Sequence, residues 1–189
     1  MNSAEKITQA FPDFLNSDVL SLLQKVSLKS EHQISQTFEV IVDSEKLEIP
    51  YRIYFEEPNV KNLTETELLI LNCLFTRHND GFVRQKKLEQ ILLSDEYWIA
   101  PFIMQLLGEY VCEILLTIEK DLSDTLLDNL IRFIEENPKF FETTKSRIVS
   151  YWNCYYRNRL LNEESYVGFR ILTKLITFAK TKNRKTTSQ

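Results

Sequence analysis

Residues 64–93 read TETELLILNCLFTRHNDGFVRQKKLEQILL, and this stretch decides the fold class. Thr64 and Glu67 have the spacing of a capping box, in which each side chain accepts a hydrogen bond from the other residue's backbone N–H. Apolar residues then recur at helical spacing as far as Phe75. The Asn-Asp-Gly sequence at residues 79–81 is typical of a turn, and helical spacing resumes after it. The stretch therefore predicts two helices joined by a tight turn.

The turn and the helix after it resemble the start of the second helix in HEAT-type repeats. In those repeats an aspartate lies in the turn between two helices and a Val-Arg pair follows, as Asp80, Val83 and Arg84 do here. The resemblance covers about Thr64 to Ser94. It implies helix pairs stacked in layers, with Asp80 and Arg84 as structural polar groups. Because no second copy of the motif follows at a period of about 40 residues, an irregular helical bundle is the alternative.

Upstream of this stretch, the hydrophobic period changes from helical spacing to alternation. Apolar residues alternate with polar ones over residues 38–42 and again over residues 47–55. This alternation predicts a β-hairpin within residues 32–57 that turns near residues 43–46. Pro50 has no N–H to donate to a ladder, so we expect its strand at an edge of the sheet. An isolated hairpin is marginally stable in water, so its apolar face should rest on helices.

The whole pattern predicts a single, mainly α-helical domain over residues 1–189 with an N-terminal β-hairpin. Its architecture is either an irregular helical bundle or a short HEAT-like stack of helix pairs. A polar segment with one short helix is expected at residues 1–31, ahead of the hairpin. A helical core should follow at residues 64–182, and a disordered basic tail at residues 183–189.

Prolines mark helix starts inside the predicted core. Pro101 suits the first turn of a helix that would run to about Asp121. Gly108 lies within this helix, where it would let a neighbouring element approach closely. Pro138 suits the start of a later helix, which should run to about Leu160.

Catalytic motifs are lacking in this sequence. Three isolated glycines cannot build a Gly-rich phosphate loop, which excludes the Walker and dinucleotide classes of nucleotide enzyme. Glu109 and Glu113 lie four residues apart, but the Glu-x-x-His partner of a di-iron bundle is missing, so they indicate a solvated or salt-bridged helix face. His78 fits the end of a helix, where the dipole favours a positive side chain. We expect no catalytic residue, no metal site and no cofactor, and an enzyme without a recognisable motif is one alternative.

The cysteines and the N-terminus indicate the compartment. Cys73, Cys112 and Cys154 each lie within an apolar helical pattern, which predicts reduced thiols in the core. The N-terminus has neither the basic start nor the apolar segment of a signal peptide. No run reaches the roughly 20 apolar residues that cross a bilayer. The sequence therefore predicts a cytoplasmic protein without a membrane partner.

The formal net charge of −4 hides a strong asymmetry along the chain. Residues 1–138 hold 12 Lys and Arg against 24 Asp and Glu, which gives a formal charge of −12. Residues 139–189 hold 11 Lys and Arg against three Asp and Glu, which gives +8. The sequence therefore predicts that the C-terminal third presents a positive face.

One segment of this basic third combines aromatic residues with cations. At about 100° per residue, one helix face carries an apolar stripe with Lys145 and Arg159 near it. The stripe consists of Phe141, Ile148, Trp152 and Tyr155 and is widened by Val149 and Tyr156. The stripe fits a core helix whose cations extend along apolar neighbours to reach solvent. It also fits an exposed binding surface, because Tyr, Trp and Arg are common anchors of protein interfaces. In the second case the predicted partner-binding residues are Lys145, Trp152, Tyr155, Tyr156, Arg157 and Arg159.

The favoured function is therefore a non-catalytic protein-binding module, such as an adaptor, an inhibitor or an immunity-type partner. The basic third would receive an acidic protein surface. Nucleic acid is the alternative partner, because bases could stack on the same aromatic surface beside basic tail residues. Those tail residues are Lys180, Lys182, Arg184 and Lys185. The sequence leaves the oligomeric state open, and a homo-oligomer is compatible with it.

Overall fold

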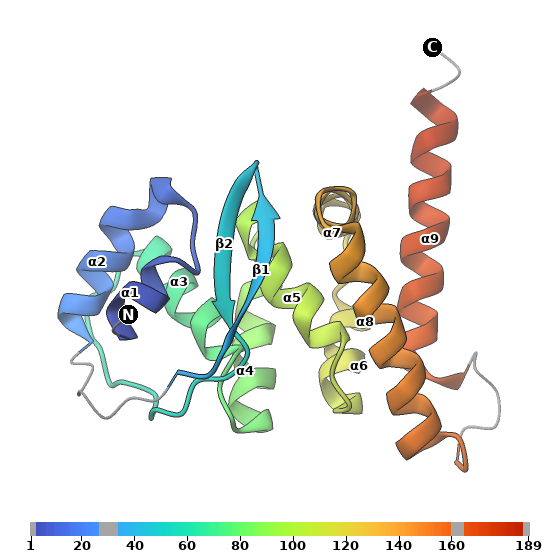
Figure 1. The fold of residues 1–189 in the computed structure, drawn as a ribbon, viewed down its shortest axis with the longest axis horizontal. Coiled ribbons are helices and arrows are strands. Elements are labelled where there is room, and N and C mark those ends of the chain that lie inside the picture. Colours follow the sequence, from blue (N-terminus) through green and yellow to red (C-terminus); the bar gives the residue numbers. More distant parts are fainter. Residues whose placement is uncertain (1–2, 27–33, 160–164, 187–189) are drawn as a thin grey trace. The chain divides into compact units, whose positions relative to one another are not determined.

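The computed structural model describes residues 3–26, 34–159 and 165–186 of the chain. Within these residues it contains nine α-helices and one two-stranded antiparallel sheet near the N-terminus (Figure 1). The predicted fold class, mainly α with an N-terminal β-hairpin, is confirmed. HEAT-like stacking stays a prediction. Residues 27–31 of the predicted N-terminal segment lie outside the described residues.

The chain divides into two compact units, unit 1 at Met1–Phe102 and unit 2 at Ile103–Gln189. Unit 1 holds 10 Lys and Arg against 16 Asp and Glu, and unit 2 holds 13 against 11. The acidic residues of unit 2 are therefore concentrated between residues 103 and 138, ahead of the basic third. That the two units form a single domain stays a prediction.

Unit 1 begins with two short helices, α1 at Ser3–Thr8 and α2 at Asn16–Lys25. A 3₁₀ turn, η1 at Asp13–Leu15, separates them. The sequence predicted α2 but neither α1 nor η1. Phe11 anchors this region, because it is buried and stacks on Phe102 with ring centroids 5.4 Å apart.

The opening stretch forms the predicted helix pair, α3 at Glu65–Phe75 and α4 at Gly81–Ile91. At the start of α3, Thr64 Oγ1 accepts a hydrogen bond from the Glu67 N–H at 3.1 Å. The Glu67 carboxylate accepts in return from the Thr64 N–H at 2.8 Å. The predicted capping box is therefore confirmed.

The turn between α3 and α4 is held by the two polar residues that the sequence identified. Asp80 Oδ1 accepts a hydrogen bond from the Phe82 N–H at 2.8 Å and so caps α4. Arg84 is buried, and its Nη1 donates to the carbonyls of His78 and Asn79 at 2.9 and 3.0 Å. Both side chains are structural, as predicted. Asp80 satisfies an N–H that the start of α4 leaves free, and Arg84 satisfies two carbonyls of the turn.

Glu67 also joins α3 to α2 through a buried carboxylate. Lys25 Nζ lies 2.6 Å from Glu67 Oε2, and the Ser21 hydroxyl donates to Oε1 at 2.6 Å. Together with the Thr64 N–H, these bonds lower the pKa of Glu67 from 4.5 to about 2, with Lys25 the largest cause. The carboxylate therefore stays charged, because its hydrogen bonds favour the ionised form.

The hairpin consists of β1 at Thr37–Val42 and β2 at Glu45–Pro50, and Val42 pairs with Glu45. Only two residues form the turn, Asp43 and Ser44, whose φ angles are 52° and 68°. Two positive φ angles are typical of the type I′ turn, whose twist matches that of the strands. The turn is therefore tighter than the four residues predicted. The inward side chains of both strands are buried.

The second strand is shorter than the sequence predicted. It was expected to reach residue 55, but the regular strand β2 ends at Pro50. Pairing continues beyond it only as isolated bonds, from the Tyr51 N–H to the Gln36 carbonyl and from the Ser35 N–H to the Arg52 carbonyl, both at 2.9 Å. The chain then pairs with the turn between α3 and α4. The Ile53 N–H donates to the Arg77 carbonyl at 2.9 Å, and the Ile53 carbonyl accepts from the Asn79 N–H at 3.0 Å.

The helix predicted from Pro101 to about Asp121 is two helices, α5 at Ala100–Leu107 and α6 at Cys112–Lys120. A short 3₁₀ turn, η2 at Tyr97–Ile99, precedes α5. The break follows from Gly108, because glycine loses more conformational freedom in a helix than any other residue. The predicted close approach is confirmed, since a Cβ on Gly108 would lie 3.2 Å from Arg147 Cδ.

Two predictions about burial need correction. Glu109 is buried, whereas the sequence predicted a solvated or salt-bridged face on the helix surface shared with Glu113. The break after α5 removes Glu109 from the helix on which that prediction rested. Cys73 is buried as predicted, but Cys112 at the start of α6 is half-buried and Cys154 is exposed. An apolar neighbourhood in the sequence did not determine which side of the helix each thiol occupies.

Unit 2 is completed by α7 at Asp124–Glu136, α8 at Pro138–Tyr151 and α9 at Val167–Thr186. The last helix, α9, packs against α6, α7 and α8 (Figure 1). Arg170 on α9 holds Glu119 on α6 through two hydrogen bonds, from Nε at 2.8 Å and from Nη2 at 2.6 Å. A bidentate pair of this kind fixes the orientation of both side chains.

The C-terminal helix extends past the predicted end of the core. It continues to Thr186, so residues 183–186 of the predicted tail carry on the helix, and residues 187–189 lie outside the described residues. Among the helices of the described residues, none is both long and apolar enough to cross a membrane.

Candidate functional site

The predicted aromatic helix changes its geometry near its end. After α8, a π-helical turn, η3, covers Trp152–Tyr156, and the Arg157 N–H donates to the Trp152 carbonyl five residues back, at 2.8 Å. The sequence predicted a regular helix to about Leu160, which lies outside the described residues. π-helical turns are rare and frequently occur at functional sites. The wider turn also displaces the following side chains from a stripe drawn at 100° per residue.

Half of that stripe belongs to the core of unit 2. Phe141, Ile148 and Trp152 are buried. Trp152 meets Phe169 of α9 edge to face, with ring centroids 5.5 Å apart. Trp152 was among the predicted partner-binding residues, but in this position it offers a partner little surface and instead supports the residues around it.

The charge of Lys145 is paired within its own helix. Its Nζ lies 2.6 Å from Glu142 Oε1 and 5.2 Å from the centre of the Phe141 ring. The side chain is half-buried, in agreement with a cation that extends along an apolar neighbour. Of the predicted site residues, Lys145 is therefore the one whose charge is neutralised within a turn of the same helix.

An exposed group of three aromatic rings, which we call the tyrosine cluster, lies beside the π-helical turn. It consists of Tyr110, Tyr151 and Tyr155. The three ring centroids are 5.6 to 6.1 Å apart, within the range of favourable aromatic contacts. Tyr110 is 49% exposed and Tyr155 is 59% exposed. The cluster therefore offers contiguous aromatic surface to solvent.

The cluster is fixed from beneath by two further tyrosines. The Tyr156 hydroxyl donates to the Tyr110 carbonyl at 2.6 Å, and so ties η3 to the segment between α5 and α6. Tyr156 also stacks on buried Tyr166, with ring centroids 5.1 Å apart. Burial is the largest cause that raises the pKa of both phenols, so both stay protonated at neutral pH. Half-buried Tyr156 is thus a positioning residue for the cluster.

Arg157 and Arg159 follow the π-helical turn and are exposed. The guanidinium carbon of Arg157 lies 5.8 Å from the centre of the Trp152 ring, and its Nη1 lies 3.4 Å from Asn153 Oδ1. No ion pair joins either arginine to another residue that the structure describes. Two predicted cations thus lie next to the tyrosine cluster with their charge facing solvent.

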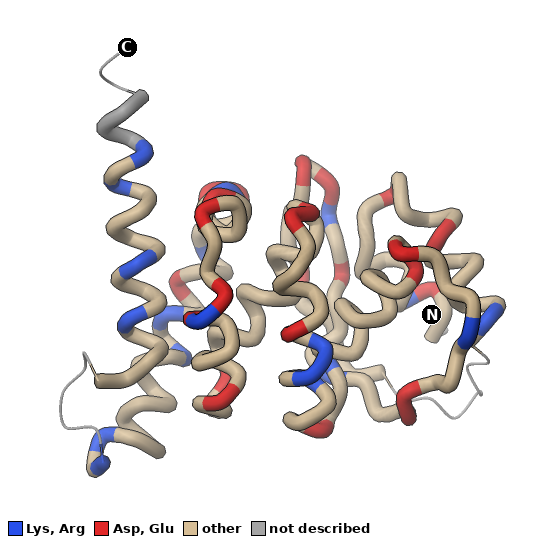
Figure 2. Tube along the Cα trace, turned by 180° about the vertical axis from the view of Figure 1, so that it is seen from behind, with Lys and Arg blue, Asp and Glu red and all other residues tan. Residues whose placement is uncertain are grey.

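The rest of the basic third is only partly neutralised. Arg170 and Lys182 form ion pairs with Glu119 and Asp128, both from the acidic part of unit 2. The helix α9 carries no Asp or Glu, and Lys and Arg recur along it in Figure 2. Exposed Lys174 and Lys180 of this helix form no ion pair with a described residue. A net positive surface therefore persists on α9 and on the turn after η3.

Catalytic arrangements are not apparent in the described residues. His78 is held in the turn before α4, where its ring nitrogens face the Phe55 carbonyl at 3.1 Å and the Asp80 N–H at 3.0 Å. Burial raises the pKa of the Cys73 thiol well above its usual value, which opposes formation of the nucleophilic thiolate. No group of three or more His, Cys, Asp or Glu among the described residues is arranged to hold a metal ion.

The sequence found only part of the tyrosine cluster. Tyr155 was predicted, but Tyr110 and Tyr151 were missed. The spacing of Tyr151 and Tyr155, four residues apart, was a usable signal, because such residues share a helix face. No local pattern links Tyr110 to them, since it lies more than 40 residues earlier in the chain.

Comparisons of the chain with protein-family models, with curated proteins and with solved structures found no match. The functional proposal therefore rests on the residues of this chain and on their geometry.

Proposed function

We propose that this chain is a non-catalytic protein-binding module that recognises its partner through the tyrosine cluster and the adjacent arginines. The observation that carries the proposal is the exposure of Tyr110 and Tyr155 in one packed group of rings. Tyrosine anchors protein interfaces effectively, because it offers a large apolar ring and a polar hydroxyl while losing little conformational entropy. An adaptor, an inhibitor and an immunity-type protein all fit this role.

Rigid support beneath the cluster strengthens the proposal. The hydrogen bond from the Tyr156 hydroxyl fixes the backbone at Tyr110, and the packing of Trp152 on Phe169 anchors the π-helical turn that carries Tyr155. Interface residues that are already ordered lose less entropy when a partner binds. The surface is therefore prepared for association without a large rearrangement.

Charge supports an acidic partner surface. Arg157 and Arg159 lie beside the cluster, and α9 adds further exposed cations. At a Debye length of about 8 Å in physiological salt, cations gathered on one face act together on an approaching partner. Such steering mainly raises the association rate. Three free cysteines suit a reducing compartment, so we propose the cytoplasm as the location.

Site-specific photo-crosslinking in cells tests the proposal. The crosslinking residue p-benzoylphenylalanine would replace Tyr155 in one variant and Ile176, an exposed residue of α9, in a matched control. We expect a discrete protein adduct at position 155 and none of the same mass at position 176. Equal adducts at both positions, or none at position 155, would contradict the proposal.

Charge reversal then tests the role of the arginines. Arg157→Glu combined with Arg159→Glu should slow association with the captured partner by about tenfold at low salt. The melting temperature should stay unchanged, because both side chains are exposed. If the charge reversal leaves the association rate unchanged, the prediction that the partner's surface is acidic is wrong.

Nucleic acid is a second candidate partner, because exposed tyrosines beside arginines also suit base stacking. Binding of a single-stranded oligothymidine distinguishes the two partners. Nucleic-acid binding through this surface should weaken steeply as salt rises and should be lost in Tyr155→Ala. We expect no such Tyr155-dependent binding. Finding it would favour nucleic acid over an acidic protein.

A further inference from the structure

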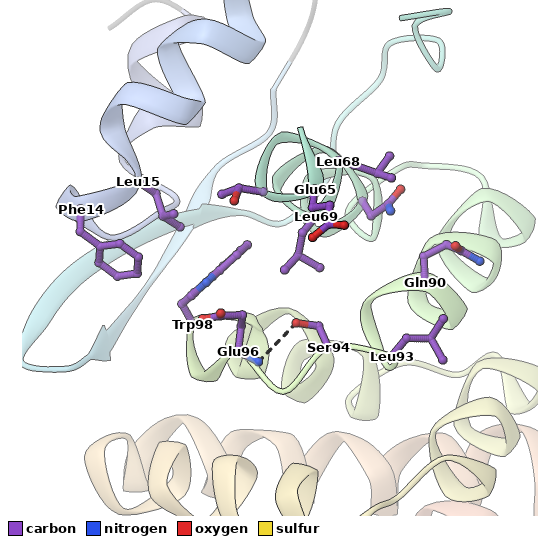
Figure 3. A pocket seen from close by; sticks show the side chains of 12 residues that line it. Phe14, Leu15, Glu65, Leu68, Leu69, Gln90, Leu93, Ser94, Glu96 and Trp98 are labelled. Carbon is purple, nitrogen blue, oxygen red and sulfur yellow. Dashed lines mark hydrogen bonds between the residues drawn. The ribbon is translucent and has the colours of Figure 1, made fainter. Parts of the chain in front are cut away.

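Unit 1 carries a groove that the tyrosine cluster does not involve. It encloses about 680 Å³ and lies between η1, α3, the end of α4 and η2 (Figure 3). Leu15 and Trp98 are buried and Leu69 is half-buried, and together they form its apolar floor. On α3, Glu65, Leu68, Leu69 and Asn72 follow one another at helical spacing, so one face of α3 forms a wall of the groove.

The edges of the groove expose large apolar side chains. Phe14 is 64% exposed, Leu68 is 47% exposed and Leu93 is 82% exposed. A single exposed leucine is ordinary, but three large apolar residues around one hollow form a contiguous apolar patch. Phe14 and Leu93 lie at opposite ends of the groove in Figure 3. A small ligand on the floor would leave both in water, whereas a chain that spans the groove would cover them.

The polar groups of the groove indicate the charge of its occupant. Glu65 and Glu96 line it, both exposed, and neither forms an ion pair with a described residue. No Lys or Arg is among the lining residues. Charge complementarity therefore favours an occupant with apolar side chains flanked by cations.

A buried carboxamide adds a polar anchor. Asn72 lines the groove and is buried, and its Oδ1 has no hydrogen-bond partner among the described residues. A buried acceptor without a partner is costly, so a group that donates to it on binding is favoured. The side chain has an acceptor and two donors, and rotation about its last bond can present either to the occupant.

We propose that this groove binds a basic amphipathic helix of a partner protein, with apolar residues on the floor and Lys or Arg opposite Glu65 and Glu96. The lining residues lie on helices, on 3₁₀ turns and on the loop between α4 and η2, and none lies on a strand, so an extended peptide could not bind by adding a strand. A helix that lays its apolar face in a groove needs no free backbone groups. This site is independent of the tyrosine cluster and adds a second binding surface on unit 1.

A designed peptide tests the groove directly. The probe is a fluorescent amphipathic helix of leucine and lysine, about 14 residues or four turns long. We expect fluorescence anisotropy to show saturable binding. A peptide with the same leucines and with glutamate in place of lysine should bind at least about tenfold more weakly, because its charge opposes Glu65 and Glu96. Equal binding of the two peptides would overturn the basic occupant.

Matched variants locate the binding. Leu93→Ser should weaken binding about tenfold, because a leucine buried in the complex contributes about that much to affinity. Phe82→Ser is the control, since Phe82 is 85% exposed and does not line the groove. Leu68→Ser and Leu20→Ser form a second pair, at 47% and 52% exposed. The proposal is overturned if each control weakens binding as much as its partner variant.

Charge variants and self-association complete the test. Glu65→Lys with Glu96→Lys should raise the Kd several-fold at low salt and reduce its salt dependence, whereas Glu89→Lys, outside the groove, should not. Sedimentation of the protein at rising concentration tests whether a second copy of the chain occupies the groove. Self-association that Leu93→Ser abolishes would identify that occupant and overturn the partner helix. All of these variants lie in unit 1, so their failure would leave the proposal for the tyrosine cluster standing.

Discussion

The groove of unit 1 and the tyrosine cluster of unit 2 both expose apolar side chains, but they do so in different chemical settings. The groove has four leucines, two aromatic residues and two carboxylates in its lining, and it contains Asn72 with an unsatisfied oxygen. The tyrosine cluster is aromatic, carries hydroxyl groups and lies beside exposed arginines. The difference matches the two partners that we propose, a basic amphipathic helix for the groove and an acidic protein surface for the cluster.

Thiol labelling should give the largest difference between the two units. Cys154 lies in η3 and is exposed, whereas Cys73 lies in α3 and is buried. A maleimide should modify Cys154 at least about a hundredfold faster, because a buried thiol reacts only when its surroundings open. Single-cysteine variants would give each rate by mass spectrometry.

The same labelling tests whether the groove and the tyrosine cluster bind different partners. The leucine and lysine peptide should leave the Cys154 rate unchanged, because the peptide occupies unit 1. Protection of Cys154 by the peptide would place it on the tyrosine cluster instead.

Packing beneath the cluster should be sensitive to one methyl group. A Cβ on Gly168 would lie 2.7 Å from Tyr166 Cε1 and 2.8 Å from Ile148 Cγ2, and both residues are buried. Gly168→Ala should therefore lower the free energy of unfolding by about 1 to 3 kcal/mol, as overpacking does. Denaturant titration measures the loss. Gly81→Ala is the control, since its nearest neighbour would lie 3.6 Å away, and it should cost nothing.

Acid should loosen unit 1 before unit 2. The pKa of Glu67 is about 2 in the folded chain against 4.5 unperturbed, so its contribution is complete above pH 4.5 and is lost as the pH falls towards 2. The loss should reach roughly 2 kcal/mol. Amide exchange at pH 3 should then rise more in α2 and α3 than in α9.

Glu67→Gln serves as the control for this pH dependence. The variant should be less stable at pH 7 and should lose the difference in amide exchange between pH 5 and pH 3. If wild type and variant respond to acid alike, another group is responsible.

An unsatisfied hydroxyl in unit 2 should contribute little to stability. Tyr166 Oη is buried and has no hydrogen-bond partner among the described residues. Tyr166→Phe should therefore leave the free energy of unfolding unchanged or raise it by about 1 kcal/mol. Thermal unfolding is the measurement. A loss of stability would show that the hydroxyl has a partner, and would separate it from Asn72, whose partner we assign to a bound helix.

The smallest effect is expected for a surface ion pair. Lys182 Nζ lies 2.6 Å from Asp128 Oδ1, and both side chains are about half exposed. Lys182→Ala should change the free energy of unfolding by less than about 0.5 kcal/mol, because water and salt screen exposed charges. Lys25→Ala should cost more, since its partner Glu67 is buried. Equal effects would mean that burial does not distinguish the two pairs.

Local patterns predicted those parts of the fold that local interactions determine. The capping box of Thr64 and Glu67, the α3–α4 turn and the alternating strands each depend on residues a few positions apart. The break at Gly108 was missed, because apolar periodicity continues through it and only backbone entropy distinguishes the position. The end of regular β2 at Pro50 was missed, because the apolar alternation continues to residue 55 while only isolated bonds pair that stretch with residues 34–36.

The binding surfaces were harder to predict, because they combine distant segments. Tyr155 was found from its own helix, but its contact with Tyr110 depends on how α5, α6 and η3 pack. The groove was missed entirely, since its walls come from four segments between residues 14 and 98. Exposure also depends on helix rotation, so Cys154, which lies in the π-helical turn, is exposed although its apolar neighbourhood predicted a core thiol.

The geometry of the tyrosine cluster depends on the number of residues in the π-helical turn, and not only on which side chains the turn carries. Its hydrogen bond from Arg157 to Trp152 encloses one residue more than an α-helical turn. Deleting one residue from the turn would restore regular α-helical bonding, and the residues after it would keep about their present rotation, because a π-helical turn accommodates one extra residue within a helix. The helix would survive such a deletion, but Tyr155, which lies inside the wide turn, would lose its present position beside Tyr110. A single-codon change in length could therefore abolish or create this surface in one step.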